Sequence, residues 1–149
     1  MTDRGHFQHG LVAHCDTGTH GALLMVDLGR RFDDEEIAEI AASMCEHLGT
    51  ECLITPTART EFAVLLPTAG RHEAIGVADT LLGVIHRHVG SRAGGWRSSA
   101  SIGLACEDDV ASLAAETLRT AADRALYDAQ SSANDRVAIY DSKRHDDCA

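Results

Sequence analysis

Short apolar runs alternate along this chain with longer segments in which apolar residues recur every three or four positions. The short runs contain many branched and aliphatic side chains and end at charged or turn-forming residues, which is typical of strands in a buried sheet. We expect strands over residues 22–28, 52–55, 62–66, 96–106 and 137–140. A polar turn joins the second and third strands as a hairpin, and the third strand ends at Pro67.

The longer segments have the spacing of amphipathic helices. One helix begins at the acidic residues 33–36, which complement the helix dipole, and ends before Gly49. Two more helices are expected over residues 71–89 and 110–130. The resulting order, β-α-β-β-α-β-α-β, predicts an α+β, ferredoxin-like fold. Such a fold has a mainly antiparallel sheet of about five strands, with helices packed on one face.

The two ends of the chain differ in composition from this central part. Residues 21–141 are expected to form one folded domain, preceded by a flexible or loosely packed lead-in over residues 1–20 and followed by an unstructured, charged tail over residues 142–149. Imidazole and thiolate groups bind zinc, and the lead-in carries several, namely His6, His9, His14, His20 and Cys15. Because their spacing matches no known zinc pattern, we predict no metal there.

The charge balance narrows the range of partners. The 149 residues include 13 Lys and Arg against 23 Asp and Glu, which gives a formal net charge of -10. This excess of negative charge argues against binding to nucleic acid or to an anionic membrane. No apolar run approaches the roughly 20 residues that a membrane span needs, and the N-terminus lacks a secretion signal pattern. We therefore expect a cytoplasmic protein.

Four segments resemble, in order and spacing, those of a GGDEF domain, the diguanylate cyclase family. They are Val26-Asp27-Leu28, residues 61–67 (Glu-Phe-Ala-Val-Leu-Leu-Pro), residues 99–105 (Ser-Ala-Ser-Ile-Gly-Leu-Ala) and residues 122–129 (Ala-Asp-Arg-Ala-Leu-Tyr-Asp-Ala). The resemblance extends over residues 22–141 and implies the palm-like fold of that family, in agreement with the strand and helix order predicted above.

Diguanylate cyclases join two GTP molecules, and the resemblance implies a site in which two carboxylates hold divalent metal ions. Asp27 occupies the first carboxylate position, at the end of the first strand. The signature turn of the family has two glycines, an acidic residue, glutamate and phenylalanine. Here it reads Ala58, Arg59, Thr60, Glu61 and Phe62. Thr60 thus replaces the second metal-binding carboxylate, and its neutral hydroxyl cannot take the place of that ligand.

Other positions also lack the residues with which the family binds nucleotide. The side chains of Ala58 and Arg59 crowd the space in which the resemblance places nucleotide against glycine backbone. The guanine-reading loop is shortened, with Glu35 near the place of its aspartate and no asparagine. Gln130 and Asn134 stand where a lysine and an arginine contact phosphate in the family. The product-binding Arg-x-x-Asp aligns with residues 49–52, which read Gly-Thr-Glu-Cys.

These departures favour a catalytically inactive domain that regulates by protein contact. The resemblance implies self-association as a homodimer or pairing with a signalling or regulatory protein, and we expect no cofactor. An alternative is a receptor for a nucleotide or small anion in the altered cleft. In that case Arg30, Arg31 and Arg59 would supply positive charge near Asp27.

A further alternative is a metal-dependent nucleotide enzyme of altered chemistry, with one metal ion held by Asp27, Glu61 or Glu35. Glu61 follows the missing carboxylate directly, but adjacent side chains on a strand point to opposite faces, so Glu61 does not simply replace Thr60. We therefore predict no catalytic residues. A residual metal or ligand site would draw on Asp27, Glu35, Arg30, Arg31 and Arg59.

Overall fold

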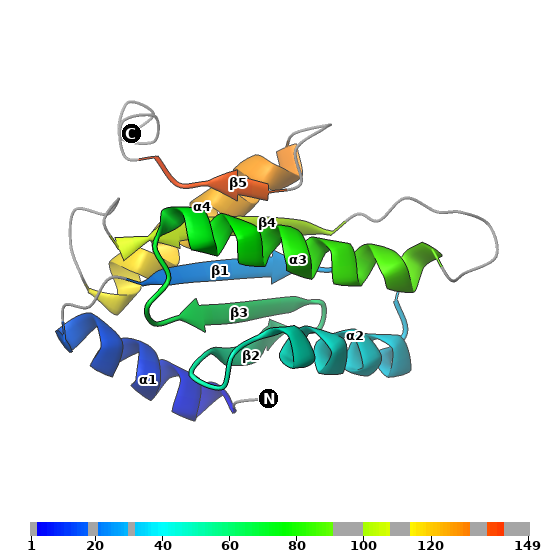
Figure 1. Cartoon of the computed structure of the whole chain (residues 1–149), viewed down its shortest axis with the longest axis horizontal. Helices are drawn as coiled ribbons and strands as arrows, with labels where there is room; N and C mark the ends of the chain where they lie inside the picture. The colour runs from blue at the N-terminus through cyan, green and yellow to red at the C-terminus, as the bar shows by residue number, and fades with distance from the viewer. Residues whose placement is uncertain are drawn as a thin grey trace.

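The computed structural model describes residues 3–17, 21–29, 32–90, 100–107, 114–131 and 137–141. Five strands and four helices follow one another along these residues (Figure 1). They are α1 (Arg4–Thr17), β1 (Ala22–Asp27), α2 (Asp34–His47), β2 (Leu53–Ala58), β3 (Glu61–Leu66), α3 (Arg71–Gly90), β4 (Ser101–Cys106), α4 (Ala115–Ser131) and β5 (Val137–Ile139). From β1 onward this is the predicted order of strands and helices.

The five strands form one sheet in the order β2-β3-β1-β4-β5. The central strand, β1, is antiparallel to both β3 and β4, whereas β5 runs parallel to β4. The sheet is therefore mixed but mainly antiparallel, and the predicted α+β fold is confirmed. The edge strand β2 continues past the predicted residues 52–55 and includes Pro56, which an edge strand tolerates because one side of its backbone needs no partner.

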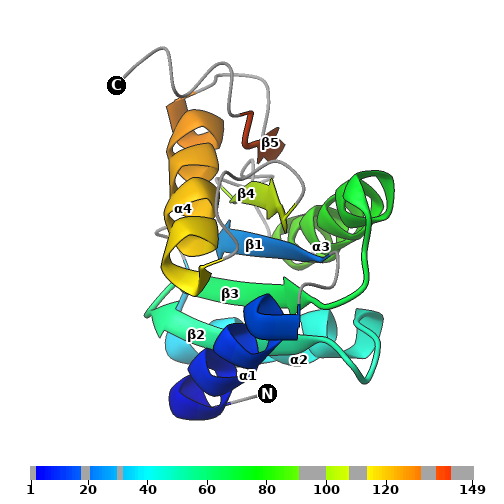
Figure 2. The same ribbon diagram turned by 90° about the vertical axis from the view of Figure 1, so that its left-hand side faces the viewer.

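Helices cover both faces of the sheet, so the prediction that they pack on one face is wrong. On one face Leu24, Val26 and Val64 pack with residues of α2 and α3. On the other face Leu23 and Met25 pack with residues of α1 and α4. Figure 2 shows α1 and α4 on one side of the sheet and α3 on the other. The physical reason is that the central strands are apolar at successive positions and need cover on both sides.

The predicted loosely packed lead-in over residues 1–20 is also corrected, because residues 4–17 form helix α1. Phe7, Leu11 and His14 recur at a helical spacing and are buried against the sheet. Glycines and exposed histidines occupy other positions of this segment, so its amphipathic pattern is too weak to predict a helix from the sequence. Residues 1–2 and 18–20 of the lead-in and the predicted tail over residues 142–149 lie outside the described residues.

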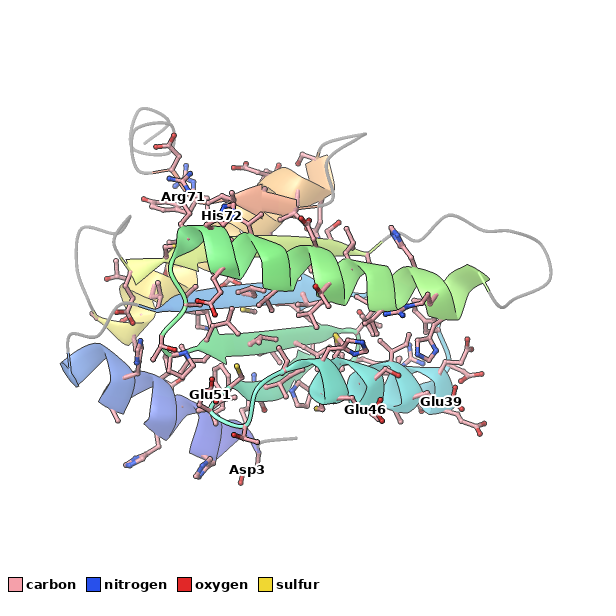
Figure 3. All side chains as sticks on the ribbon, viewed as in Figure 1. Asp3, Glu39, Glu46, Glu51, Arg71 and His72 are labelled. Carbon is pink, nitrogen blue, oxygen red and sulfur yellow. The ribbon has the colours of Figure 1, made fainter. Side chains whose placement is uncertain are left out.

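Helix α2 begins where the acidic residues predicted it. Asp33 accepts a hydrogen bond from the backbone N–H of Glu36, and the Glu36 carboxylate accepts one from the backbone N–H of Asp33, which forms a capping box. Further along α2, Glu39 and Glu46 are exposed and project from the helix away from the sheet (Figure 3). None of the described helices combines the length and the apolar character needed to cross a bilayer.

Candidate functional site

The hairpin turn between β2 and β3 lies against the end of the central strand. The backbone N–H of Leu28, just after β1, donates a hydrogen bond of 2.8 Å to the carbonyl of Thr60. In the sheet register Asp27 of β1 lies opposite Glu61 of β3. The structure therefore brings together Asp27, Thr60 and Glu61, three of the residues that the sequence singled out.

Both carboxylate oxygens of Asp27 accept hydrogen bonds from the protein itself. The backbone N–H of Gly29 donates to Oδ1 over 2.9 Å, and the side-chain amide of Gln130 donates to Oδ2 over 2.6 Å. Gly29 has a φ of 89°, a left-handed conformation that a glycine adopts without strain. Gln130 comes from the last turn of α4, so this contact joins α4 to the end of β1.

Arg59 of the signature turn points toward the start of α2. Its Nε donates to Asp34 Oδ1 over 3.1 Å, and its Nη2 donates to the carbonyl of Phe32 over 3.3 Å. Both side chains of the Arg59–Asp34 ion pair are largely exposed, so the pair contributes at most about 1 kcal/mol. The pair nevertheless links the hairpin turn to the start of α2. Glu35 lies exposed on the first turn of that helix. Arg30 and Arg31 lie outside the described residues.

A second acidic side chain from α4 lies near Glu61. Burial raises the pKa of Glu61, and the negative charges of Asp123 and Asp27 raise it further, while the neighbouring Thr57 side chain and the charge of Arg119 act in the opposite direction. Burial also raises the pKa of Asp123, against the effect of Arg119. Asp123 and Arg119 were not among the site residues predicted from the sequence. Their helical spacing of four from each other, and of seven between Asp123 and Gln130, is the signal that could have found them.

These residues do not fit the two-cation site that the resemblance implied. Each oxygen of Asp27 accepts one hydrogen bond, from Gly29 or from Gln130, and Thr60 supplies no carboxylate. Across the described ranges, no three His, Cys, Asp or Glu side chains are arranged so that they could hold a metal ion. In the N-terminal helix, His14 instead forms a buried ion pair with Glu107, at the end of β4.

Solved structures of GGDEF domains have this fold. The GGDEF domain of PA1120 (TpbB or YfiN) from Pseudomonas aeruginosa superposes with a TM-score of 0.79 at 21% identity, over 100% of this chain and 96% of that one. The GGDEF domain of DgcB from Caulobacter crescentus, solved in complex with c-di-GMP, gives 0.72 at 21% identity, over 94% of this chain and 89% of that one.

The diguanylate cyclase SiaD from Pseudomonas aeruginosa, solved in complex with its activator SiaC, gives a TM-score of 0.74 at 22% identity. This match covers 93% of the present chain and 58% of SiaD. No model of a known protein family matches the present sequence, and no curated protein matches it. The similarity therefore lies in the fold, which is that of a GGDEF domain.

Proposed function

We propose that this protein is a catalytically inactive GGDEF-like domain that acts through contact with other proteins. The observation that carries the proposal is the state of Asp27, whose carboxylate is hydrogen-bonded to Gln130 and Gly29 while Thr60 occupies the other metal-binding position. The carboxylate of Asp27 thus connects the end of β1 to α4.

The chemistry of cyclic dinucleotide formation explains why these replacements matter. Condensing two nucleoside triphosphates requires metal ions that activate a hydroxyl and neutralise phosphate charge. A threonine does not hold such an ion, and the neutral amide of Gln130 does not offer positive charge to a phosphate. Each lost electrostatic contact of this kind costs about 3 kcal/mol of transition-state stabilisation. Together these losses lower the rate by several orders of magnitude.

An exposed aromatic side chain on α4 supports the contact role. Tyr127 has an exposed fraction of 69%, the larger of the two values among the exposed large hydrophobic side chains of the described residues. Tyrosine is enriched at the centres of protein interfaces because its ring is large, rigid and amphipathic. The SiaD–SiaC complex is a precedent for regulation by a partner of a protein that contains this fold. For the present chain the proposed partner is a signalling or regulatory protein, or a second copy in a homodimer.

Chemical cross-linking followed by affinity capture tests this function. Purified protein is cross-linked alone and in extract of the source cells, and its mass in solution is measured by light scattering. We expect a dimer or a defined complex that Tyr127→Ser weakens at least about tenfold, because hot-spot truncations cost about 2 kcal/mol or more. Asp79→Asn, at an exposed position of α3 on the opposite face, is the matched control and should leave the complex intact. Monomeric protein without a partner would contradict the proposal.

A further inference from the structure

A cavity of about 350 Å³ lies between α1, α4 and the sheet face that these two helices cover. Its floor consists of buried side chains from three neighbouring strands, Met25 of β1, Ala63 of β3 and Thr55 of β2. These three residues lie opposite one another in the sheet register, so they form a row across the strands. Residues 58–62 do not line this cavity, although Arg119 and Thr57, which lie near Glu61, border both regions.

The cavity exists because its two helices pack over different strands. Helix α1 packs chiefly against β2, whereas α4 packs against β4 and β1. Figure 2 shows the two helices crossing the same side of the sheet at different strands. Phe7 and Leu11 of α1 form the apolar wall on one side, and the small side chain of Ala63 leaves the space beneath them unfilled.

Two cationic side chains stand at this cavity. Arg4 and Arg119 are the ionisable residues among those that line it, and both are exposed, in contrast to the buried floor. The Arg4 guanidinium donates to the carbonyl of Thr57 over 3.4 Å, which places it beside β2. Arg119 also lies close enough to Glu61 and Asp123 to lower the pKa of each. In a chain with a net charge of -10, a cavity whose described lining residues include two arginines and no carboxylate favours an anionic group.

The lining also includes two threonine hydroxyls of β2, those of Thr55 and Thr57. The hydroxyl of Thr55 is buried, with an exposed fraction of 1%, and has no hydrogen-bond partner within the part of the chain that the structure describes. A buried hydroxyl without a partner is unfavourable, because it has lost its hydrogen bonds to water. A ligand that reaches the floor with a polar atom would supply the missing partner.

We propose that this cavity binds a small aromatic carboxylic acid with a polar group on its ring. The carboxylate pairs with the guanidinium groups of Arg4 and Arg119, the ring packs on Phe7 and Met25, and the polar group of the ring bonds to Thr55. The cavity volume is at the lower end of the range for small-molecule sites, about 300–1,000 Å³, so the ligand contains one or two rings. This proposal is independent of the function proposed for the chain.

Isothermal titration calorimetry with three related probes tests the site. Indoleacetate has the carboxylate, the ring and a ring N–H; naphthaleneacetate lacks the N–H; and tryptophol lacks the carboxylate. We expect indoleacetate to bind saturably at one site, and tryptophol to bind at least about tenfold more weakly because it lacks the charge-assisted hydrogen bonds. Thr55→Val should weaken indoleacetate about fivefold and leave naphthaleneacetate unchanged.

Variants of the wall and floor complete the test. Ala63→Leu fills the cavity and should abolish binding, and Arg119→Gln should weaken it about tenfold. Arg124→Gln, at an exposed position of the same helix, is the charge-matched control and should bind like the wild type. The absence of saturable indoleacetate binding by the wild-type protein would overturn the proposal. Binding that neither Ala63→Leu nor Arg119→Gln changes would overturn it equally.

Discussion

The side-chain amide of Gln130 donates a hydrogen bond of 2.6 Å to the carboxylate of Asp27, across 103 positions of the chain. One partner lies at the end of the central strand and the other in the last turn of α4. In the GGDEF family, to which the sequence bears a resemblance, these two positions serve metal and phosphate. Here the two side chains form a hydrogen bond with each other, which connects β1 to α4.

The Gln130–Asp27 contact should contribute to stability. Gln130→Ala removes the donor and is expected to lower the free energy of unfolding by about 1 kcal/mol, the usual value for a hydrogen bond of this kind. Urea unfolding of Gln130→Ala, Asp27→Ala and the double variant measures the coupling between the two residues. If the two single effects simply add, the contact contributes nothing and this interpretation of Asp27 is wrong.

The buried ion pair between His14 and Glu107 should anchor helix α1 to the sheet. Both side chains are almost fully buried, so His14→Ala leaves the carboxylate of Glu107 without this partner inside the protein. We expect a loss of about 3 kcal/mol in the free energy of unfolding. His9→Ala, at an exposed position of the same helix, should change it by less than about 0.5 kcal/mol. Equal losses in the two variants would contradict an anchoring role for His14.

Two glycines in contrasting surroundings should respond in opposite ways to alanine. A Cβ at Gly103 would stand 2.1 Å from the backbone nitrogen of Leu126, because α4 lies directly on β4. Gly103→Ala should therefore destabilise the protein by about 3 kcal/mol. A Cβ at Gly83, inside α3, meets no atom within 4 Å, so Gly83→Ala should stabilise it by about 0.5–1 kcal/mol. Thermal unfolding compares the two variants, and a stable Gly103→Ala protein would refute this packing of α4.

The pKa of Glu61 predicts a specific dependence of stability on pH. Burial and the charges of Asp123 and Asp27 raise this pKa in the folded protein, so folding favours the protonated carboxyl. The resulting stability is present below the ordinary pKa of glutamate and is lost as the pH rises through the raised value. Glu61→Gln removes the charge and should raise the midpoint of thermal unfolding near neutral pH.

The gain from Glu61→Gln should disappear as the pH falls to about 4, where the wild-type carboxyl is also protonated. Thermal scans from near-neutral pH down to about 4 give the difference in unfolding midpoint between Glu61→Gln and the wild type at each pH. Glu39→Gln, at an exposed position of α2, is the control for a change in net charge alone. A gain from Glu61→Gln that stays constant across the range would show that charge on Glu61 is not its cause.

Local patterns allowed most of the fold to be predicted from the sequence. The apolar runs that became β1 and β3 and the acidic start of α2 are signals carried by neighbouring residues. Helix α1 was missed because the segment that contains Phe7, Leu11 and His14 also carries glycines and exposed histidines, which weaken its amphipathic pattern. Strands that are apolar at successive positions bury both of their faces, so helices are expected on both sides of the sheet. The sequence contained this signal, and the prediction of helices on one face did not take it into account.

The candidate site was predicted in part. Asp27 and the signature turn were located correctly because strand ends and hairpin turns are local features. The bond from Gln130 to Asp27 and the approach of Asp123 to Glu61 depend on how α4 lies across the sheet. Helical spacing places Asp123 and Gln130 on one face of α4, but it does not indicate which strand that face meets, since only the tertiary fold brings these residues together.

Formation of cyclic di-GMP from GTP is the measurement that tests the central claim most directly. Purified protein is incubated with GTP and either Mg²⁺ or Mn²⁺, and the products are separated by chromatography beside an active diguanylate cyclase. The account predicts no product above that of the protein-free sample, because Asp27 is hydrogen-bonded to Gln130 and Thr60 replaces the second carboxylate. Product that increases with protein concentration and disappears in Asp27→Asn would contradict it.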